Sequence, residues 1–269
     1  MNMLEWIQHY VWQGVDHFFL IDNDSTDDYK AHLAPYVERG QVTIIHLSEQ
    51  HVQAAHYNHV LSAYGVRDIT EWLIVCDLDE FYFATGRDGS QTVREYLQRV
   101  PENVSCIYSS MKMFGSRDEY EHPASVRRAF LYREGRLHSY GKAILRSRRI
   151  HKLSIHRHEF DGTEIIDDDD IHLNHYVIQS KEYFDKVKKT RGDADGHVRD
   201  DAYFIQHDLR EVYDDALVRL LDQTDQSLME AFEMRQSSSL ITMMSILLPI
   251  VLVVTIFVVV IFRMTHRKD

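Results

Sequence analysis

The sequence predicts an α/β fold in which a mostly parallel sheet is flanked by helices, followed by a C-terminal transmembrane helix. Strand-like and helix-like segments alternate in the first part of the chain, and two apolar strand segments run directly into acidic residues. A charge-free apolar run lies near the C-terminus. Alternation is typical of parallel sheets, because each crossover between parallel strands needs a connection about as long as a helix.

Helical apolar spacing opens the chain, and β-branched and aromatic runs follow it. The expected order is a helix over Met3–Trp12, a strand over Val15–Ile21, a helix over Tyr29–Glu38, a strand over Val42–Leu47, a helix over Gln50–Tyr64 and a strand from Glu71. This is the order of a nucleotide-binding half-domain, in which ligands lie at the carboxyl ends of the strands.

The stretch Glu71–Phe83 is the one around which the chain is organised. An apolar run predicts a buried strand, which must end at Asp77, Asp79 and Glu80 because buried carboxylates without partners are costly. Asp77 and Asp79 point the same way in extended backbone, and this pair suits Mn²⁺ or Mg²⁺. The alternative is a strand end whose solvated acids only lead into a turn.

A second strand, Val15–Ile21, also runs into acidic and small polar residues. At its carboxyl end Asp22 and Asn23 are candidates to hydrogen-bond a nucleoside. The alternative for the residues that follow, Asp24 to Asp27, is capping of the next helix.

Basic residues gather later in the chain, at Lys142, Arg146, Arg148 and Arg149. Near a metal site such cations bind phosphate, and Lys142 is the candidate for that role. The alternative is a positive strand face that balances the many acids.

Composition limits the class of protein. The 269 residues suffice for one large domain with an appendage. The formal net charge of −12 argues against a nucleic-acid partner, which needs a basic surface. Cys76 and Cys106 have no zinc or redox spacing and are expected in the core. No secretory signal is visible at the start of the chain.

Five ordered blocks resemble the glycosyltransferase family 2-like proteins, including the related family 92. The first block comprises Glu5-Trp6-Ile7, His9-Tyr10, Gly14-Val15-Asp16-His17-Phe18 and Asp22-Asn23-Asp24-Ser25-Thr26-Asp27. The others are Trp72-Leu73 with Asp77-Leu78-Asp79-Glu80-Phe81, Phe114-Gly115-Ser116, Gly141-Lys142-Ala143-Ile144-Leu145-Arg146, and Asn174 to Phe184 with Lys186 and Arg191-Gly192. The similarity covers roughly Leu4 to Gly192.

The resemblance implies a GT-A fold, a nucleotide-sugar donor such as a UDP-sugar, a divalent metal and inversion at the anomeric carbon. A late histidine completes the metal site in many GT-A enzymes. His175, inside the fifth block, is preferred here to His156 or His158.

Two departures from the family pattern stand out. Family members usually carry a further strand before the first helix, whereas only Met1-Asn2-Met3 precedes that helix here. We therefore expect either a shortened start or an incomplete donor site. Gln179 stands where the family often has a lysine, which removes a positive charge near the diphosphate.

The C-terminal part predicts a membrane anchor. The 23 positions from Leu240 to Phe262 carry no charge and are mostly apolar, which is enough to cross a bilayer. The expected organisation is a catalytic domain over 1–200, a helical stalk over 201–239, a transmembrane helix over 240–262 and a basic tail over 263–269. Endomembranes (ER or Golgi) and viral or plasma membranes stay open as the location, and so does the orientation.

The function predicted is a membrane-anchored, metal-dependent glycosyltransferase, such as a hexosyltransferase, with a glycan, glycoprotein or glycolipid acceptor. Glu80 is the candidate catalytic base, since it lies beside the expected metal ligands; its alternative role is to stabilise the turn. The competing class is a catalytically inactive GT-A-fold binding or scaffolding protein. A metal-dependent phosphohydrolase would need further His and Asp ligands at strand ends.

Overall fold

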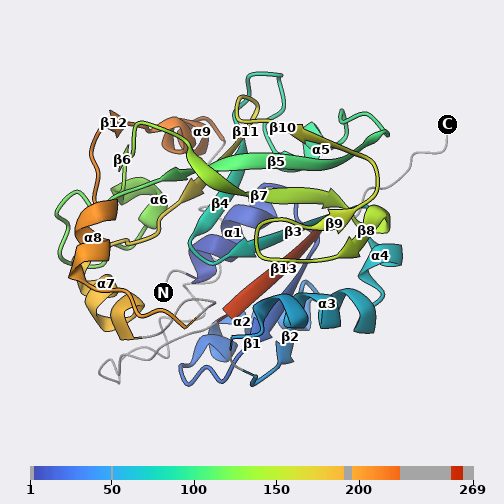
Figure 1. Ribbon diagram of the computed structural model, residues 1–269, viewed down its shortest axis with the longest axis horizontal. Coiled ribbons are helices and arrows are strands. Elements are labelled where there is room, and N and C mark those ends of the chain that lie inside the picture. Colours follow the sequence, from blue (N-terminus) through green and yellow to red (C-terminus); the bar gives the residue numbers. More distant parts are fainter. Residues whose placement is uncertain (1–2, 50, 191–195, 225–255, 263–269) are drawn as a thin grey trace.

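The computed structural model describes residues 3–49, 51–190, 196–224 and 256–262, the last of these by its backbone alone. The chain forms a mixed α/β domain around a curled sheet with helices on both faces (Figure 1). The predicted elements of the first part of the chain are confirmed to within a few residues at each end.

Nine described strands form the main sheet. Their order is β2 (Val42–His46), β1 (His17–Asp22), β13 (Ile256–Phe262), β3 (Trp72–Asp77), β7 (His138–Arg146), β5 (Val104–Met113), β11 (Ile171–His175) and β4 (Glu80–Ala84), with β10 (Thr163–Ile166) also paired to β5.

The prediction of a mostly parallel sheet is wrong. The β1–β2, β5–β10 and β5–β11 pairs are parallel, whereas the other five strand pairs described in this sheet are antiparallel. Helices separate β1, β2 and β3, as expected for parallel strands. Beyond Asp77 the chain mostly turns back through loops and short helical turns, so that strands enter the sheet in both directions.

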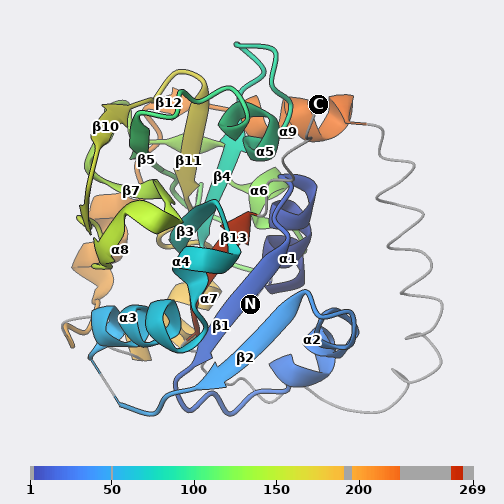
Figure 2. The same cartoon turned by 90° about the vertical axis from the view of Figure 1, so that its right-hand side faces the viewer.

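Two cores cover the two faces of the sheet, as Figure 2 shows for the helices on either side of β1 and β2. Alternate residues of each strand supply them, with Phe18 and Trp72 on one face and Phe19 and Leu73 on the other. The first face packs against α1 (Met3–Trp12), α2 (Tyr29–Glu38), α5 (Val93–Leu97) and α6 (Val126–Ala129), and the second against α3 (Gln53–Ala63) and α4 (Val66–Ile69). Both cysteines are buried and free, as expected.

The region expected as a helical stalk is not one continuous helix. Its described part forms α8 (Asp201–His207), β12 (Val212–Tyr213) and α9 (Ala216–Gln223). Phe204, Leu217 and Leu221 are buried in the core beneath the sheet, which explains why this region folds onto the domain. Residues 225–239 lie outside the described residues.

Part of the predicted membrane span is a strand of the main sheet. Ile256–Phe262 form β13, which pairs antiparallel with both β1 and β3. No helix within the described ranges is long and apolar enough to cross a membrane. Residues 240–255 lie outside the described residues. The last seven positions of the predicted span are therefore a strand and not part of a helix.

A polar cluster fixes β12 and α9 to the sheet. Lys112 Nζ donates to His172 Nδ1 at 2.8 Å and lies 3.4 Å from the Asp214 carboxylate, to which Arg133 Nε donates at 2.7 Å. Burial, with help from Lys112, lowers the pKa of His172 to about 4. His172 is therefore neutral in the folded protein at neutral pH, which suits its role as an acceptor.

The first prediction concerns strand β13. Val258 is the register partner of Cys76, and directly opposed cysteines in neighbouring strands lie within disulfide range. We expect Val258→Cys to cross-link to Cys76 under a mild oxidant, detected by peptide mass spectrometry. Val260→Cys, paired with Ile74, is the matched control and should not react. Equal or absent cross-linking in the two variants would contradict the register.

The second prediction concerns His172 and pH. Its pKa is about 4 when folded, against about 6.5 in an unfolded chain, so the unfolded state binds more protons between these values. The contribution of His172 to stability is full above pH 6.5 and is lost as the pH falls toward 4. We expect the free energy of unfolding in urea to fall less over this range in His172→Asn, by at most about 3 kcal/mol. An identical pH dependence in both proteins would contradict this assignment.

Candidate functional site

The candidate site is the turn between β3 and β4, which we call the acid turn (residues 77–80). Helix α1 holds its backbone from beneath. Trp6 Nε1 donates to the carbonyl oxygens of Asp77 and Glu80, each at 3.0 Å, and the Tyr10 hydroxyl donates to the same Glu80 oxygen at 3.1 Å. Both rings are fully buried, so the acid turn is fixed to the core.

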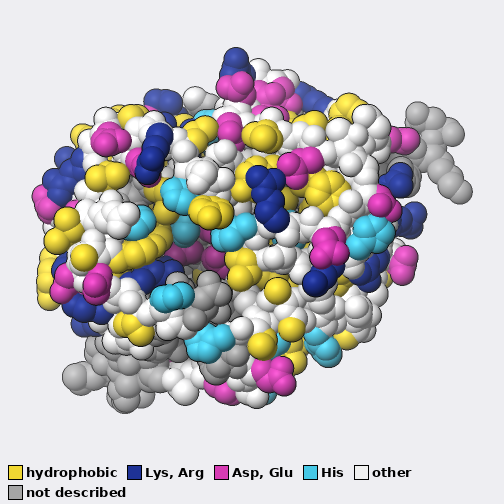
Figure 3. Space-filling view, viewed as in Figure 1, with side chains coloured by type: hydrophobic (Ala, Val, Ile, Leu, Met, Phe, Trp, Pro, Cys, Tyr) yellow, Lys and Arg dark blue, Asp and Glu magenta, His cyan; other side chains and the backbone are white. Residues whose placement is uncertain are grey.

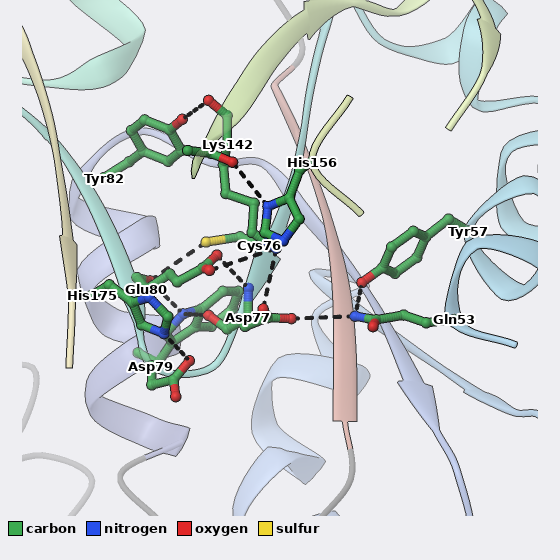
Figure 4. A network of polar contacts seen from close by, with 12 residues as sticks. Gln53, Tyr57, Cys76, Asp77, Asp79, Glu80, Tyr82, Lys142, His156 and His175 are labelled. Carbon is green, nitrogen blue, oxygen red and sulfur yellow. Dashed lines mark hydrogen bonds and ion pairs between the residues drawn. The ribbon is translucent and has the colours of Figure 1, made fainter. Parts of the chain in front are cut away.

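Lys142 lies between two of the three acids (Figure 4). Its Nζ is 3.1 Å from the Asp77 carboxylate and 3.5 Å from that of Glu80. Burial opposes the charge of this lysine, but the two acids raise its pKa well above the ordinary value. Burial also raises the pKa of Glu80 to about 7, whereas Lys142 keeps the pKa of Asp77 below its usual range despite burial. Lys142 is thus a buried counter-ion to Asp77 and, in part, to Glu80.

Asp79 has its own counter-ions. The buried Lys188 Nζ donates to the Asp79 carboxylate, and His175 Nε2 lies 3.6 Å from it. Burial would raise the pKa of Asp79, but Lys188 and then His175 hold it well below the ordinary value. Asp79 is therefore ionised and paired.

The three acidic side chains differ in how much of their surface is exposed to solvent. The Asp77 side chain is 33 % exposed, the Asp79 side chain 10 % and the Glu80 side chain 1 %. Glu80 accepts a hydrogen bond from the backbone N–H of Asp77 at 2.9 Å. Its carboxylate thus stabilises the acid turn, as the alternative role foresaw, and its catalytic role stays a prediction.

Metal binding was expected at Asp77, Asp79 and His175. Among the described residues, no three His, Cys, Asp or Glu side chains form a group that could hold a metal ion. Magnesium commonly takes one or two carboxylates and completes its shell with water and substrate phosphates. The partly exposed carboxylate of Asp77 fits such a shared ion, and the buried His175 Nδ1 atom, which has no hydrogen-bond partner among the described residues, is a further candidate ligand.

Asp22 and Asn23 lie at the same edge of the sheet as the acid turn. In register, Asp22 pairs with Ile256 and Asp77 with Phe257, on opposite sides of β13. Their side chains serve the local loop. Asp22 accepts from the Ser25 N–H at 2.8 Å, and the Asn23 amide donates to two backbone carbonyls of the loop after β2. The contact with a nucleoside stays a prediction.

Two site residues were not foreseen from the sequence. Gln53, on α3, donates to Asp77 at 3.4 Å, and Lys188, on the short 3₁₀ helix η2 (Lys188–Thr190), pairs with Asp79. The resembling block instead drew attention to Lys186, which is an exposed partner of Glu182. Spacing alone gave no signal for Lys188, because its contact crosses 109 positions of the chain.

Histidines surround a hollow in one face of the domain. Figure 3 shows histidine and hydrophobic side chains around a depression with acidic side chains at its floor. His156, whose Nδ1 lies 3.1 Å from the Gly141 carbonyl oxygen, points into the same space as Lys142 and Asp77 (Figure 4). His156 and His158 both lie in the loop between β8 (Ile150–Lys152) and β9 (Glu159–Phe160).

Charged side chains gathered at the carboxyl ends of strands are typical of the ligand-binding edge of α/β domains. The sequence model of Glycosyltransferase family 92 matches residues 1–213, most of the chain. The chain belongs to glycosyltransferase family 92 and is a glycosyltransferase, and this membership implies a nucleotide-sugar donor and a glycan acceptor. Searches of curated proteins and of solved structures found no match.

The third prediction tests the buried pair at Asp79. Lys188→Met leaves the Asp79 carboxylate buried without its main counter-ion, which typically costs about 3–5 kcal/mol. We expect a loss of that order in the urea unfolding free energy, partly recovered when Asp79→Asn is added. Lys189→Met is the matched control, since this exposed lysine pairs with exposed acids and should cost at most about 1 kcal/mol. Equal losses in the two lysine variants would refute the assignment.

Proposed function

We propose that the acid turn is the donor site of this glycosyltransferase. A nucleotide-sugar, with UDP as the expected nucleotide, binds over the turn, and its sugar moves with inversion to a hydroxyl of a glycan, glycoprotein or glycolipid. The domain is then of the GT-A type. The observation that carries the proposal is Asp77, whose carboxylate is held by the buried Lys142 and still reaches the solvent.

The residues around Asp77 act by fixing one carboxylate in place. Lys142 and Gln53 each contact an oxygen of Asp77, and Glu80 holds its backbone N–H. A side chain held on several sides needs little reorganisation when the substrate arrives, which is what catalytic positioning requires. Lys188 and His175 hold Asp79 in the same way.

A divalent ion is a further part of the proposal. The acids and lysines of the site nearly cancel in charge, and the group most open to solvent is a carboxylate. A diphosphate therefore meets little positive charge from the described side chains alone. Mn²⁺ or Mg²⁺, held by Asp77 with Asp79 and His175 nearby, would supply the charge that stabilises the leaving diphosphate.

The base that receives the acceptor proton must come within hydrogen-bond reach of the hydroxyl. Glu80 is fully buried beneath Lys142, which supports a positioning role for it over direct contact with an acceptor. Membrane anchoring through residues 240–262 stays a prediction, and β13 limits it as described above.

The fourth prediction tests the donor site. We expect the Asp77→Asn/Asp79→Asn variant to lose at least about a hundredfold in sugar transfer or in hydrolysis of nucleotide-sugars, because the carboxylates that would hold the divalent ion on the diphosphate are gone. The assay is release of nucleoside diphosphate from a panel of nucleotide-sugars, with Mn²⁺ or with a chelator. Asp169→Asn, at an exposed acid paired with Arg87, is the control for general effects of lost charge.

Full activity in the double variant would contradict the assignment of the acid turn. Equal activity with Mn²⁺ and with a chelator would contradict the metal alone and leave the donor site standing. The anomeric configuration of the product, read by proton NMR, tests inversion separately.

A further inference from the structure

We propose that three aromatic side chains beside the acid turn, His138, Tyr140 and His156, form a platform on which the sugar ring of the acceptor stacks. This inference rests on the proposed function, because it assigns the second substrate of the same site. We call the three side chains the aromatic platform.

The geometry of the platform centres on Tyr140. Its ring centroid lies 5.6 Å from that of His138 and 5.5 Å from that of His156, with interplanar angles of 33° and 45°. Tyr140 as a whole residue is nevertheless 59 % exposed. The tyrosine ring is thus supported by two imidazoles while much of its surface is open to a ligand.

The backbone fixes the platform next to the acids. Gly141 lies so close to β5 that a Cβ atom there would stand 2.0 Å from the Ser109 carbonyl oxygen. The Gly141 carbonyl oxygen in turn bonds His156 Nδ1 at 3.1 Å. Since Lys142 contacts Asp77, and two residues of strand span roughly 6–7 Å, Tyr140 lies about one sugar ring from the acid turn.

The chemistry of the platform suits a pyranose. A pyranose ring has an apolar face of C–H bonds and a rim of hydroxyls. The face of the Tyr140 ring can pack on the apolar C–H face of the sugar. The imidazole nitrogens and the tyrosine hydroxyl can form hydrogen bonds with the sugar hydroxyls. Ligand sites of this kind combine aromatic surface with a few polar groups that set orientation.

The position in the sheet favours the acceptor over the donor base. β7, which carries the platform, neighbours β3 on the side away from β13 and β1. Asp22 and Asn23, the candidates for nucleoside contact, lie on β1 and just after it, three strand spacings or roughly 14 Å from β7. The acid turn therefore lies between the two, as a transfer site must lie between donor and acceptor.

Exposure alone does not single out Tyr140. Tyr213 is similarly exposed, at 55 %, but its ring packs on Tyr132 of the short β6 strand (Tyr132–Arg133). Neither β6 nor β12 belongs to the main sheet that carries the acid turn. Tyr213 is therefore the matched control.

The experiment is saturation-transfer NMR on the full chain with the methyl pyranosides of galactose, glucose, mannose and N-acetylglucosamine as probes. We expect transfer to the ring protons of at least one probe, lost in Tyr140→Ala and kept in Tyr140→Phe and Tyr213→Ala. With an acceptor found by activity screening, Tyr140→Ala should raise the acceptor KM at least about fivefold and leave the donor KM and donor hydrolysis within twofold.

Unchanged transfer in Tyr140→Ala would overturn the platform, as would the absence of transfer from all four probes. A rise in the donor KM instead of the acceptor KM would also overturn it, because the ring would then stack on the nucleobase. The NMR arm contains no donor, so inactive wild-type protein that still binds a pyranoside through Tyr140 would refute the proposed function and leave the platform standing.

Discussion

The partial or complete burial of three acidic side chains at the end of β3 is the constraint on which the rest of the site depends. Within four residues the chain places Asp77, Asp79 and Glu80 against the core, where a carboxylate without a partner is costly. Lys142 on β7 and Lys188 on η2 compensate them from distant parts of the chain. The folded acid turn therefore depends on contacts with distant parts of the chain.

The same constraint explains the buried polar contacts of α1. Trp6 and Tyr10 belong to a helix that packs on the sheet, yet their polar atoms bond the backbone of the acid turn. The same two side chains therefore pack in the apolar core and form the hydrogen bonds that hold the acid turn. Gly141 adds a steric requirement on the other side, since it lets β7 approach β5 and brings Lys142 and the aromatic platform to the turn.

The sequence predicted local features well, because they rest on local patterns. Apolar spacing predicted α1 and α2 at the bounds found, and the shift from apolar to acidic residues predicted where β1 and β3 end. Strand direction after Asp77 was not predictable, since it depends on which strands pair. Lys142 was identified as a cation near the acids, but its burial as their counter-ion was not, and Lys188 was missed because only tertiary folding brings it to Asp79.

The apolar C-terminal run shows the same limit. Composition predicts a membrane helix over 240–262, whereas the structure pairs Ile256–Phe262 with two strands of the sheet. Apolar, β-branched residues suit both a bilayer and the centre of a sheet, so composition cannot separate the two. The pairing of Ile256–Phe262 with both β1 and β3 depends on the whole fold, and the run itself does not encode it.

The most direct test of the account is a crystal structure of the protein with a UDP-sugar and Mn²⁺. We expect the diphosphate over the acid turn beside Asp77, with the sugar directed toward β7 and Tyr140. A nucleotide bound elsewhere on the domain, with Asp77 still facing only Lys142 and water, would contradict the central claim that this turn is the donor site.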